Sequence, residues 1–211
     1  MNNYFSPDDP YCYQGTNILI NKKNIREQSM LDKLERIYSA KRLLQLSNKP
    51  IVGLFDLAHL QKIHHFIFQD IYNFAGEIRT VNIGKGLQFC EASNIIPYFY
   101  DEISIKLKDG NYLSDLNREQ FSKRAGHFLG EINAVHPFRE GNGRSQREFI
   151  RTLAYKNGFM LDWSRVSAEA MIHASIESLV RSSDLLIPLI QKAILNDMPN
   201  KRLIEKYNSH M

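Results

Sequence analysis

The sequence has few cysteines and no long apolar run. Cys12 and Cys90 are its only two cysteines in 211 residues, and their positions match neither a zinc site nor a redox pair. A chain of this size does not need one disulfide in order to fold, so a reducing compartment fits best. No stretch approaches the roughly 18 apolar residues of a membrane-spanning helix, and residues 1–10 have neither the basic start nor the apolar centre of a signal peptide. We therefore expect a cytoplasmic protein with no membrane partner.

The excess of basic over acidic residues is also small. The chain has 27 Lys and Arg residues against 23 Asp and Glu residues, a formal net charge of +4, and the basic residues are spread along it. A DNA-binding protein normally concentrates its basic residues in a patch, so we expect no direct nucleic-acid partner. Apolar residues make up 43% and charged residues 24% of the chain, which is the balance of a globular protein with a full core. Disordered and fibrous chains are excluded.

The chain lacks repeats, low-complexity tracts and any Gly/Ser/Pro-rich linker, and its length suits one compact domain. We therefore predict a single domain over residues 1–211. Residues 1 to about 28 are rich in Asn, Asp, Pro and Tyr, which favours irregular structure packed on a larger body. Most of the remainder shows apolar residues at helical spacing. The predicted fold class is all-α, a helical bundle.

Local sequence signals mark the N-terminal ends of several of these helices. Asp56 is placed to cap one helix, and Asn117 with Gln120 forms a capping-box signal for another. Ser167 and Asp184 are placed to cap two further helices near the C-terminus.

One short run departs from the helical pattern. Ile78, Val81 and Ile83 lie in a β-prone stretch, and Gly84-Lys85-Gly86 supplies a turn. We predict a small β-hairpin over residues 78–90, attached to a helical body.

The most informative stretch is the loop and helix start at residues 136–147, HPFREGNGRSQR. Gly141 and Gly143 flank Asn142, so the backbone can adopt positive φ angles and turn successive N–H groups toward one point. The helix that follows adds its own N–H groups and the positive end of its dipole. A phosphate group is the natural occupant of such a nest.

The charged residues of this stretch extend the same prediction. Arg144 and Arg147 lie three residues apart in the first turn of a helix, so both guanidinium groups are expected on one face, where they suit a polyphosphate. Glu140 is a carboxylate beside a positive nest, an arrangement that suits Mg²⁺ held between carboxylate and phosphates. His136, at a helix end, can take the proton of an incoming hydroxyl that attacks phosphorus.

Each of these residues has an ordinary structural explanation when taken alone. A histidine at a helix end is usually structural, Gly-Asn-Gly is usually a turn, and two arginines three apart are usually a solvated face. The combination of a base, a metal carboxylate, a nest and two arginines at this spacing favours a functional site.

The stretch closely resembles the Fic-domain motif. In that motif the Phe is followed by a variable position, Asp or Glu, Gly-Asn-Gly-Arg, two variable positions and a final Arg, and every fixed position is filled here. Other segments resemble landmarks of the same family: Asp9-Pro10-Tyr11, residues 15–34, residues 74–79 and Glu131-Ile132-Asn133. The resemblance covers most of the chain.

The resemblance implies a helical Fic fold and transfer of AMP from Mg·ATP to a hydroxyl side chain of a target protein. It makes His136 the general base and Glu140 the Mg²⁺ ligand, with Arg144 on the inner phosphates and Arg147 on the γ-phosphate. It also makes the hairpin a flap that pairs with the backbone of the target. The positions expected to bind the nucleotide are Gly84, Lys85, Gly86, Glu140, Gly141, Asn142, Gly143, Arg144, Ser145, Gln146 and Arg147.

Regulation is expected to come from outside the chain. Many Fic proteins inhibit themselves with a helix that bears Ser or Thr, three variable residues and Glu, and no Glu of this chain has Ser or Thr four positions earlier. The resemblance therefore implies a toxin held inactive by a separate small antitoxin, whose Glu would pair with Arg147. For such toxins it suggests the B subunit of DNA gyrase and its topoisomerase IV counterpart as targets.

Three alternatives remain at this stage. A Fic-fold enzyme can transfer another phosphate-containing group, although the kinase-like relatives depart from the Gly-Asn-Gly-Arg that this chain keeps. A non-catalytic nucleotide-binding module would not need His136 or Glu140. A metal hydrolase built on His64, His65 and His127 would need a ligand spacing such as His-Glu-x-x-His, which is missing from the sequence.

Overall fold

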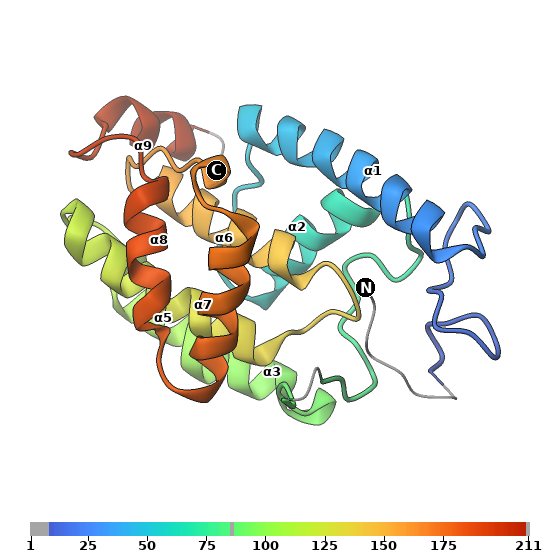
Figure 1. The fold of residues 1–211 in the computed structure, drawn as a ribbon. Helices are drawn as coiled ribbons and strands as arrows, with labels where there is room; N and C mark the ends of the chain where they lie inside the picture. Colours follow the sequence, from blue (N-terminus) through green and yellow to red (C-terminus); the bar gives the residue numbers. More distant parts are fainter. Residues whose placement is uncertain (1–8, 85–86, 210–211) are drawn as a thin grey trace.

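The computed structural model describes residues 9–84 and 87–209, which are largely helical (Figure 1). The α-helices are α1 (Gln28–Asn48), α2 (Leu57–Phe68), α3 (Ile95–Tyr98), α4 (Ile105–Asp109), α5 (Arg118–Val135), α6 (Asn142–Lys156), α7 (Ala168–Val180), α8 (Leu186–Ala193) and α9 (Lys201–Asn208). A π-helical segment, Phe99–Ser104, joins α3 to α4. Isolated bridges are the only β-pairing in the described residues. The all-α fold class is therefore confirmed.

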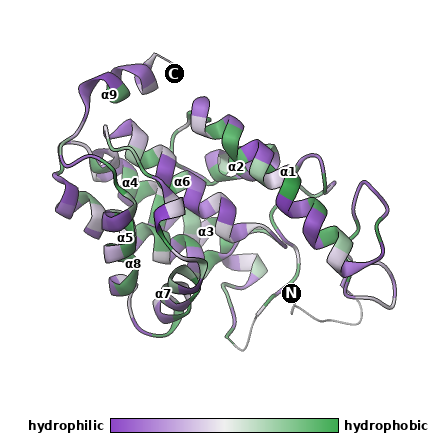
Figure 2. Cartoon of the chain, turned by 45° about the horizontal axis from the view of Figure 1, so that its top comes forward, coloured by the Kyte–Doolittle hydropathy of each residue, from purple (hydrophilic) through white to green (hydrophobic). Residues whose placement is uncertain are grey.

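The apolar sides of α5 and α6 lie in one buried cluster. Phe121, Phe128 and Ile132 of α5 and Phe149 and Leu153 of α6 have at most 1% of their surface exposed. Figure 2 shows hydrophobic and hydrophilic residues alternating along the helices, as amphipathic helices around a shared core require. The end of α5 and the start of α6 are thereby held close together, with residues 136–141 between them.

Most of the capping predictions are confirmed, and one is wrong. Asp56 accepts from His59 N (2.8 Å), Asn117 and Gln120 form the capping box, and Ser167 accepts from Ala170 N (3.2 Å). Asp184 caps no helix in this way.

The chain before α8 differs from the prediction because Ser182, and not Asp184, provides the capping side chain. Ser182 Oγ lies 2.8 Å from an Asp184 carboxylate oxygen and accepts from Asp184 N (3.4 Å). The chain then forms a 3₁₀ turn, Ser183–Leu185, before α8 begins at Leu186.

The predicted hairpin is reduced to a single contact in the described residues. Gly84 and Gln88 form an isolated antiparallel bridge, and Phe89 N donates to Ile83 O (3.3 Å). Lys85 and Gly86, predicted for the turn, lie outside the described residues. Residues 78–90 are called the flap below.

Residues 9–27 are irregular, and a buried ion pair attaches them to the loop before α6. Arg139 Nε and Nη2 both donate to Asp9 Oδ2, at 2.8 and 2.6 Å. The two side chains are 1% and 4% exposed. The Tyr11 ring makes an edge-to-face contact with the Phe74 ring. The Tyr11 hydroxyl oxygen lies 3.3 Å from Thr80 Oγ1. These contacts therefore restrain the loop from a distant part of the sequence.

His64 of α2 holds the same loop from the core side. Its Nδ1 accepts from Gly76 N (2.8 Å) and its Nε2 donates to Glu140 O (2.8 Å), and its ring stacks on Phe138 at 3.8 Å. Because the side chain is fully buried, desolvation lowers the pKa of His64 to about 3. The imidazole is neutral at physiological pH, and these two hydrogen bonds require the tautomer that carries its proton on Nε2.

Both cysteines carry free thiols. None of the helices described is long and apolar enough to cross a membrane.

We predict that Asp9→Asn lowers the free energy of unfolding by about 3 kcal/mol, because the substitution removes the Asp9 carboxylate from a buried ion pair with Arg139. Urea denaturation measures the change. Asp197→Asn is the control, since Asp197 pairs with Arg118 but is 86% exposed, and it should cost less than about 1 kcal/mol. Equal unfolding midpoints for Asp9→Asn and wild type would contradict the buried pair.

We predict that stability falls as the pH drops from about 6.5 toward 3, partly through His64. In this window the unfolded chain binds a proton at His64 and the folded chain does not, so stability changes by up to about 1.4 kcal/mol per pH unit. Burial lowers the pKa of His59 as well, which acts in the same direction. Urea midpoints at several pH values should give a shallower slope for His64→Gln than for wild type. A wild-type slope for His64→Gln would contradict the assignment.

Candidate active site

His136 lies at the C-terminal end of α5 in a left-handed backbone conformation, with φ 47° and ψ 60°. Its backbone N donates to Ile132 O (3.0 Å), and its Nδ1 lies 3.2 Å from Asn133 O. A carbonyl oxygen only accepts, so Nδ1 carries the proton and Nε2 is the basic nitrogen of the neutral ring. The ring stacks on Phe89 of the flap at 3.8 Å. The predicted base thus has a defined orientation and tautomer.

The loop between α5 and α6 is closed by its own side chains. Asn142 Nδ2 donates to Phe138 O (2.7 Å) and Asn142 Oδ1 accepts from Phe138 N (2.9 Å). Gly141 has φ 82°, and a Cβ at this position would lie 2.3 Å from the Phe68 ring, so only glycine fits. Ser145 Oγ donates to Gly141 O (3.1 Å), which gives this predicted site residue a structural contact. The loop leads directly into the first turn of α6, whose backbone N–H groups have no partner within the helix.

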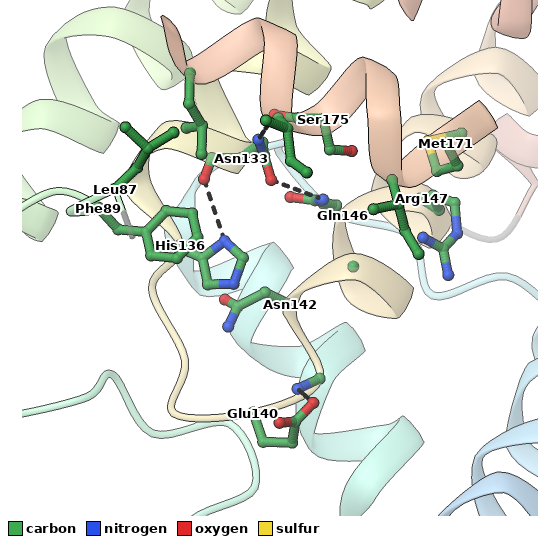
Figure 3. Close-up of a pocket in the computed structure, with 15 residues that line it drawn as sticks. Leu87, Phe89, Asn133, His136, Glu140, Asn142, Gln146, Arg147, Met171 and Ser175 are labelled. Atoms are coloured by element: carbon green, nitrogen blue, oxygen red, sulfur yellow. Dashed lines mark hydrogen bonds between the residues drawn. The ribbon is translucent and has the colours of Figure 1, made fainter. Parts of the chain in front are cut away.

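A pocket of about 330 Å³ lies beside this loop (Figure 3). One wall combines α5, the loop and the start of α6, and the facing walls come from the flap and α7. The lining residues are Leu87, Phe89, Asn133, His136, Glu140, Gly141, Asn142, Gly143, Gln146, Arg147, Met171, Ile172, Ser175, Ile176 and Leu179. Most of the predicted loop residues are therefore brought together around one space.

Arg147 supplies the cationic group of this pocket. The side chain is half-buried, and among the described residues no carboxylate pairs with its guanidinium. Burial, together with the nearby Arg144, lowers the pKa of Arg147 to about 10, so the group stays charged at neutral pH. Trp163 Nε1 donates to Arg147 O (2.9 Å) and fixes the backbone at this point. A half-buried cation of this kind favours an anionic ligand.

Arg144 differs from Arg147 and from the prediction that both arginines share one face. Its Nη2 donates to Glu35 Oε1 (2.6 Å) and its Nη1 to Ser39 Oγ (3.1 Å), both on α1. The guanidinium also lies over the Phe68 ring at 4.6 Å. Arg144 is not part of the pocket lining. The physical reason is Glu35, a carboxylate 109 residues away in the sequence that draws this guanidinium toward α1.

Glu140 is the carboxylate closest to the glycine loop. Its Oε1 accepts from Gly141 N (2.9 Å) and lies 3.5 Å from Arg144 Nη2. The described residues contain no group of three or more side chains that could hold a metal ion. Mg²⁺ commonly takes one or two protein carboxylates and completes its shell with phosphate oxygens and water. A single Glu140 beside a phosphate site therefore fits Mg²⁺ bound together with a nucleotide.

The remaining residues predicted to bind the nucleotide differ in whether they line the pocket. Gln146 lines the pocket, and its Nε2 lies 3.5 Å from Asn133 Oδ1. Gly84 is in the flap bridge and does not line the pocket, while Lys85 and Gly86 lie outside the described residues.

The three histidines of the metal-hydrolase alternative do not share a site. His64 contacts Glu140 O, His65 contacts Ala75 O, and His127 lies 3.8 Å from Glu131. The structure therefore offers this alternative no support.

Sequence reasoning missed the α7 wall and the role of Asn133. Met171, Ile172 and Ser175 line the pocket, but their pattern is that of an ordinary amphipathic helix. Asn133 had one signal, since it is a polar residue in the buried stripe of α5. Its Nδ2 donates to Ser175 O (2.9 Å) and to Ser178 Oγ (3.1 Å), so it joins α5 to α7 behind the pocket.

Comparison with known proteins gives matches over most of the chain. Residues 54–154 match the model of the Fic/DOC family. The protein adenylyltransferase VbhT of Bartonella schoenbuchensis is 39% identical over 204 residues, which are 96% of this chain and 42% of VbhT. This chain thus spans less than half the length of that relative. The probable protein adenylyltransferase y4lH of Sinorhizobium fredii is 36% identical over 179 residues, which are 84% of this chain and 92% of y4lH.

A solved structure agrees in fold. The BepC protein of Bartonella tribocorum, a VirB-translocated effector protein crystallised with bound AMPPNP, superposes with a TM-score of 0.83 at 25% identity. The match covers 88% of this chain and 96% of that chain. Since y4lH is matched over nearly its whole length and the fold agrees, this chain belongs to the Fic/DOC family.

Proposed function

We propose that this chain is a protein adenylyltransferase that transfers AMP from Mg·ATP to a hydroxyl side chain of a target protein and releases pyrophosphate. One observation carries the proposal: His136, with its basic nitrogen defined, lines the same pocket as the glycine loop and Arg147. The names of VbhT and y4lH and the AMPPNP bound to BepC support it.

In the proposed reaction His136 Nε2 accepts the proton of the target hydroxyl while the hydroxyl oxygen attacks the α-phosphorus. The bond from the α-phosphorus to its bridging oxygen breaks, and pyrophosphate leaves with the bonding electrons. The backbone N–H groups of Asn142 and Gly143 bind the inner phosphates, and Arg147 binds the γ-phosphate. The N–H group of Gly141 joins them only if it leaves Glu140 Oε1. Glu140 would hold Mg²⁺, which would supply neutralisation of the phosphate charge. Arg144 reaches the inner phosphates only if it leaves Glu35.

The two residues that follow Arg144 have different proposed roles. Gln146 contacts the nucleotide directly, because it lines the pocket. Ser145 acts through its hydrogen bond to Gly141 O, which keeps the loop in shape.

We place the target protein on the flap. Leu87 and Phe89 of the flap line the pocket, so a polypeptide that pairs with the flap backbone as an added strand would lie beside the α-phosphate. Gly84, Lys85 and Gly86 would then border both the nucleotide and the target.

The proposed regulator is a separate small antitoxin. Arg147 has no carboxylate partner among the described residues, so a Glu supplied by another protein would pair with it and displace the γ-phosphate. The proposed targets, the B subunit of DNA gyrase and its topoisomerase IV counterpart in the cytoplasm, rest on the resemblance to Fic toxins alone.

The first prediction for this function concerns the base. Incubation with bacterial lysate, Mg²⁺ and ATP should move label from the α-phosphate, and none from the γ-phosphate, onto protein. His136→Ala should reduce this labelling by on the order of 10²- to 10⁴-fold, the usual contribution of a general base, as measured by mass spectrometry of the modified proteins. His127→Ala is the control and should keep wild-type activity. Label from the γ-phosphate would indicate a kinase, and undiminished AMP transfer by His136→Ala would refute the base assignment.

The second prediction concerns Mg²⁺. Glu140→Gln should lower the transfer rate by on the order of tenfold or more, the effect of losing one contact between charged groups, and should raise the Mg²⁺ concentration needed for half-maximal rate. A titration of the rate with Mg²⁺ at saturating ATP measures both. Glu77→Gln, on an exposed residue outside the pocket, should match wild type. An unchanged Mg²⁺ titration for Glu140→Gln would remove Glu140 from the metal site.

A further inference from the structure

Arg79 is a buried arginine at the base of the flap with no role in the mechanism above. Only 1% of its surface is exposed. Its guanidinium donates to four backbone carbonyl groups: His136 O from Nε (2.8 Å), Val81 O from Nη1 (2.7 Å), and Cys90 O and Val135 O (3.3 Å) from Nη2. Its backbone N donates to Pro137 O (2.9 Å). These acceptors come from two different parts of the active site.

The first set of acceptors is the C-terminal end of α5. The last carbonyl groups of a helix have no partner within the helix, and a cation there interacts favourably with the helix dipole. Arg79 supplies donors to Val135 O and His136 O, and Cys90 N donates to Ala134 O (3.0 Å). The end of α5 is therefore completed by residues that belong to the flap.

The backbone at His136 needs such support. A residue with a Cβ is disfavoured in the left-handed region, and that conformation persists only where the surroundings hold it. His136 has φ 47°. Arg79 binds the carbonyls of His136 and of Pro137, on the two peptide groups that follow the imidazole-bearing residue.

The second set of acceptors marks both ends of the part of the flap that reaches the pocket. Val81 O and Cys90 O accept from Arg79, and in the sequence these two residues flank Leu87 and Phe89, which line the pocket. Between them, Phe89 lines the pocket and stacks on the His136 ring. One guanidinium thus binds the backbone of the base and both ends of the segment that covers it.

We propose that Arg79 is a positioning residue that holds the flap and His136 in one arrangement, so that neither can move without the other. This inference rests on the proposed function, because it gives the arrangement a role in aligning the target hydroxyl with the base. A misplacement of about 1 Å at a reacting group can lower a rate by on the order of 10²-fold, so a coupled flap and base would protect that alignment.

Lysine is unable to replace arginine in this role. The guanidinium is a planar fork of five N–H donors, and here it spans carbonyl groups from 81, 90, 135 and 136 at once. An ammonium group carries its three donors on one nitrogen atom and keeps the charge, but it lacks that span. Arg79→Lys therefore tests geometry at constant charge.

The test compares Arg79→Lys with Arg118→Lys. Arg118 is also an arginine that donates to backbone carbonyls, Gln191 O (2.7 Å) and Ile194 O (3.4 Å), but it lies at the opposite end of α5. With 18 residues in α5, the two ends are about 27 Å apart at 1.5 Å per residue. Arg79→Lys should lower kcat for AMP transfer by on the order of 10²-fold with an unchanged Kd for ATP, and Arg118→Lys should leave both unchanged. A wild-type kcat for Arg79→Lys, or an equal loss in Arg118→Lys, would overturn the proposal.

Amide hydrogen exchange tests the same coupling without any activity and without a variant. Cooperative units open with a common free energy, so the amides of Arg79, Cys90 and Phe138 in the wild-type protein should exchange with the same opening free energy. The amide of Arg79 donates to Pro137 O, that of Cys90 to Ala134 O, and that of Phe138 to Asn142 Oδ1. A lower opening free energy for Cys90 than for Phe138 would show that the flap moves alone and would overturn the proposal. If the wild-type protein transfers no AMP, the proposed function fails, while this measurement still decides whether the flap and the loop after His136 open together, as the proposal requires.

Discussion

The active site depends on one backbone constraint, the sharp turn between the end of α5 and the start of α6. The turn begins with a left-handed residue that carries a full side chain, His136, and ends with left-handed Gly141 packed against Phe68. Only six residues, 136–141, separate the two helices. The turn directs an imidazole and the N-terminal amides of a helix at the same pocket, an arrangement that a relaxed loop would not maintain.

The turn is held from three sides by groups that are distant in sequence. Asp9 binds Arg139 from the N-terminal segment, His64 binds Glu140 O from α2, and Arg79 binds the carbonyl of His136 from the base of the flap. Each of these contacts is nearly or fully buried, so each satisfies a polar or charged group that would be costly to bury alone. The irregular residues 9–27 and the flap therefore help to hold the turn at the candidate site.

The local features could be predicted from the sequence, and the long-range ones could not. The caps at Asp56 and Asn117 depend on neighbours three residues away, and the structure confirms them. The loop motif predicted the grouping around His136 and Arg147 because its residues are adjacent in the chain. The direction of Arg144 depends on Glu35, and the α7 wall depends on how α7 packs on α5, so no local pattern predicts either. At Asp184 a local rule was wrong because Ser182 formed the competing contact.

The contrast between the two motif arginines follows from what lies beside each one. Arg144 lies beside Glu35, Glu140 and the Phe68 ring. Burial acts to lower the pKa of Arg144, but the two carboxylates raise it above its usual value. Arg147 has no such carboxylate in the described residues, and its pKa is lowered. In the proposed function, a nucleotide phosphate would therefore gain more from Arg147, which has no carboxylate partner in the described residues, than from Arg144, where it would first have to displace a carboxylate. The same reasoning makes Arg147 the point at which a carboxylate from another protein would compete most directly with a nucleotide.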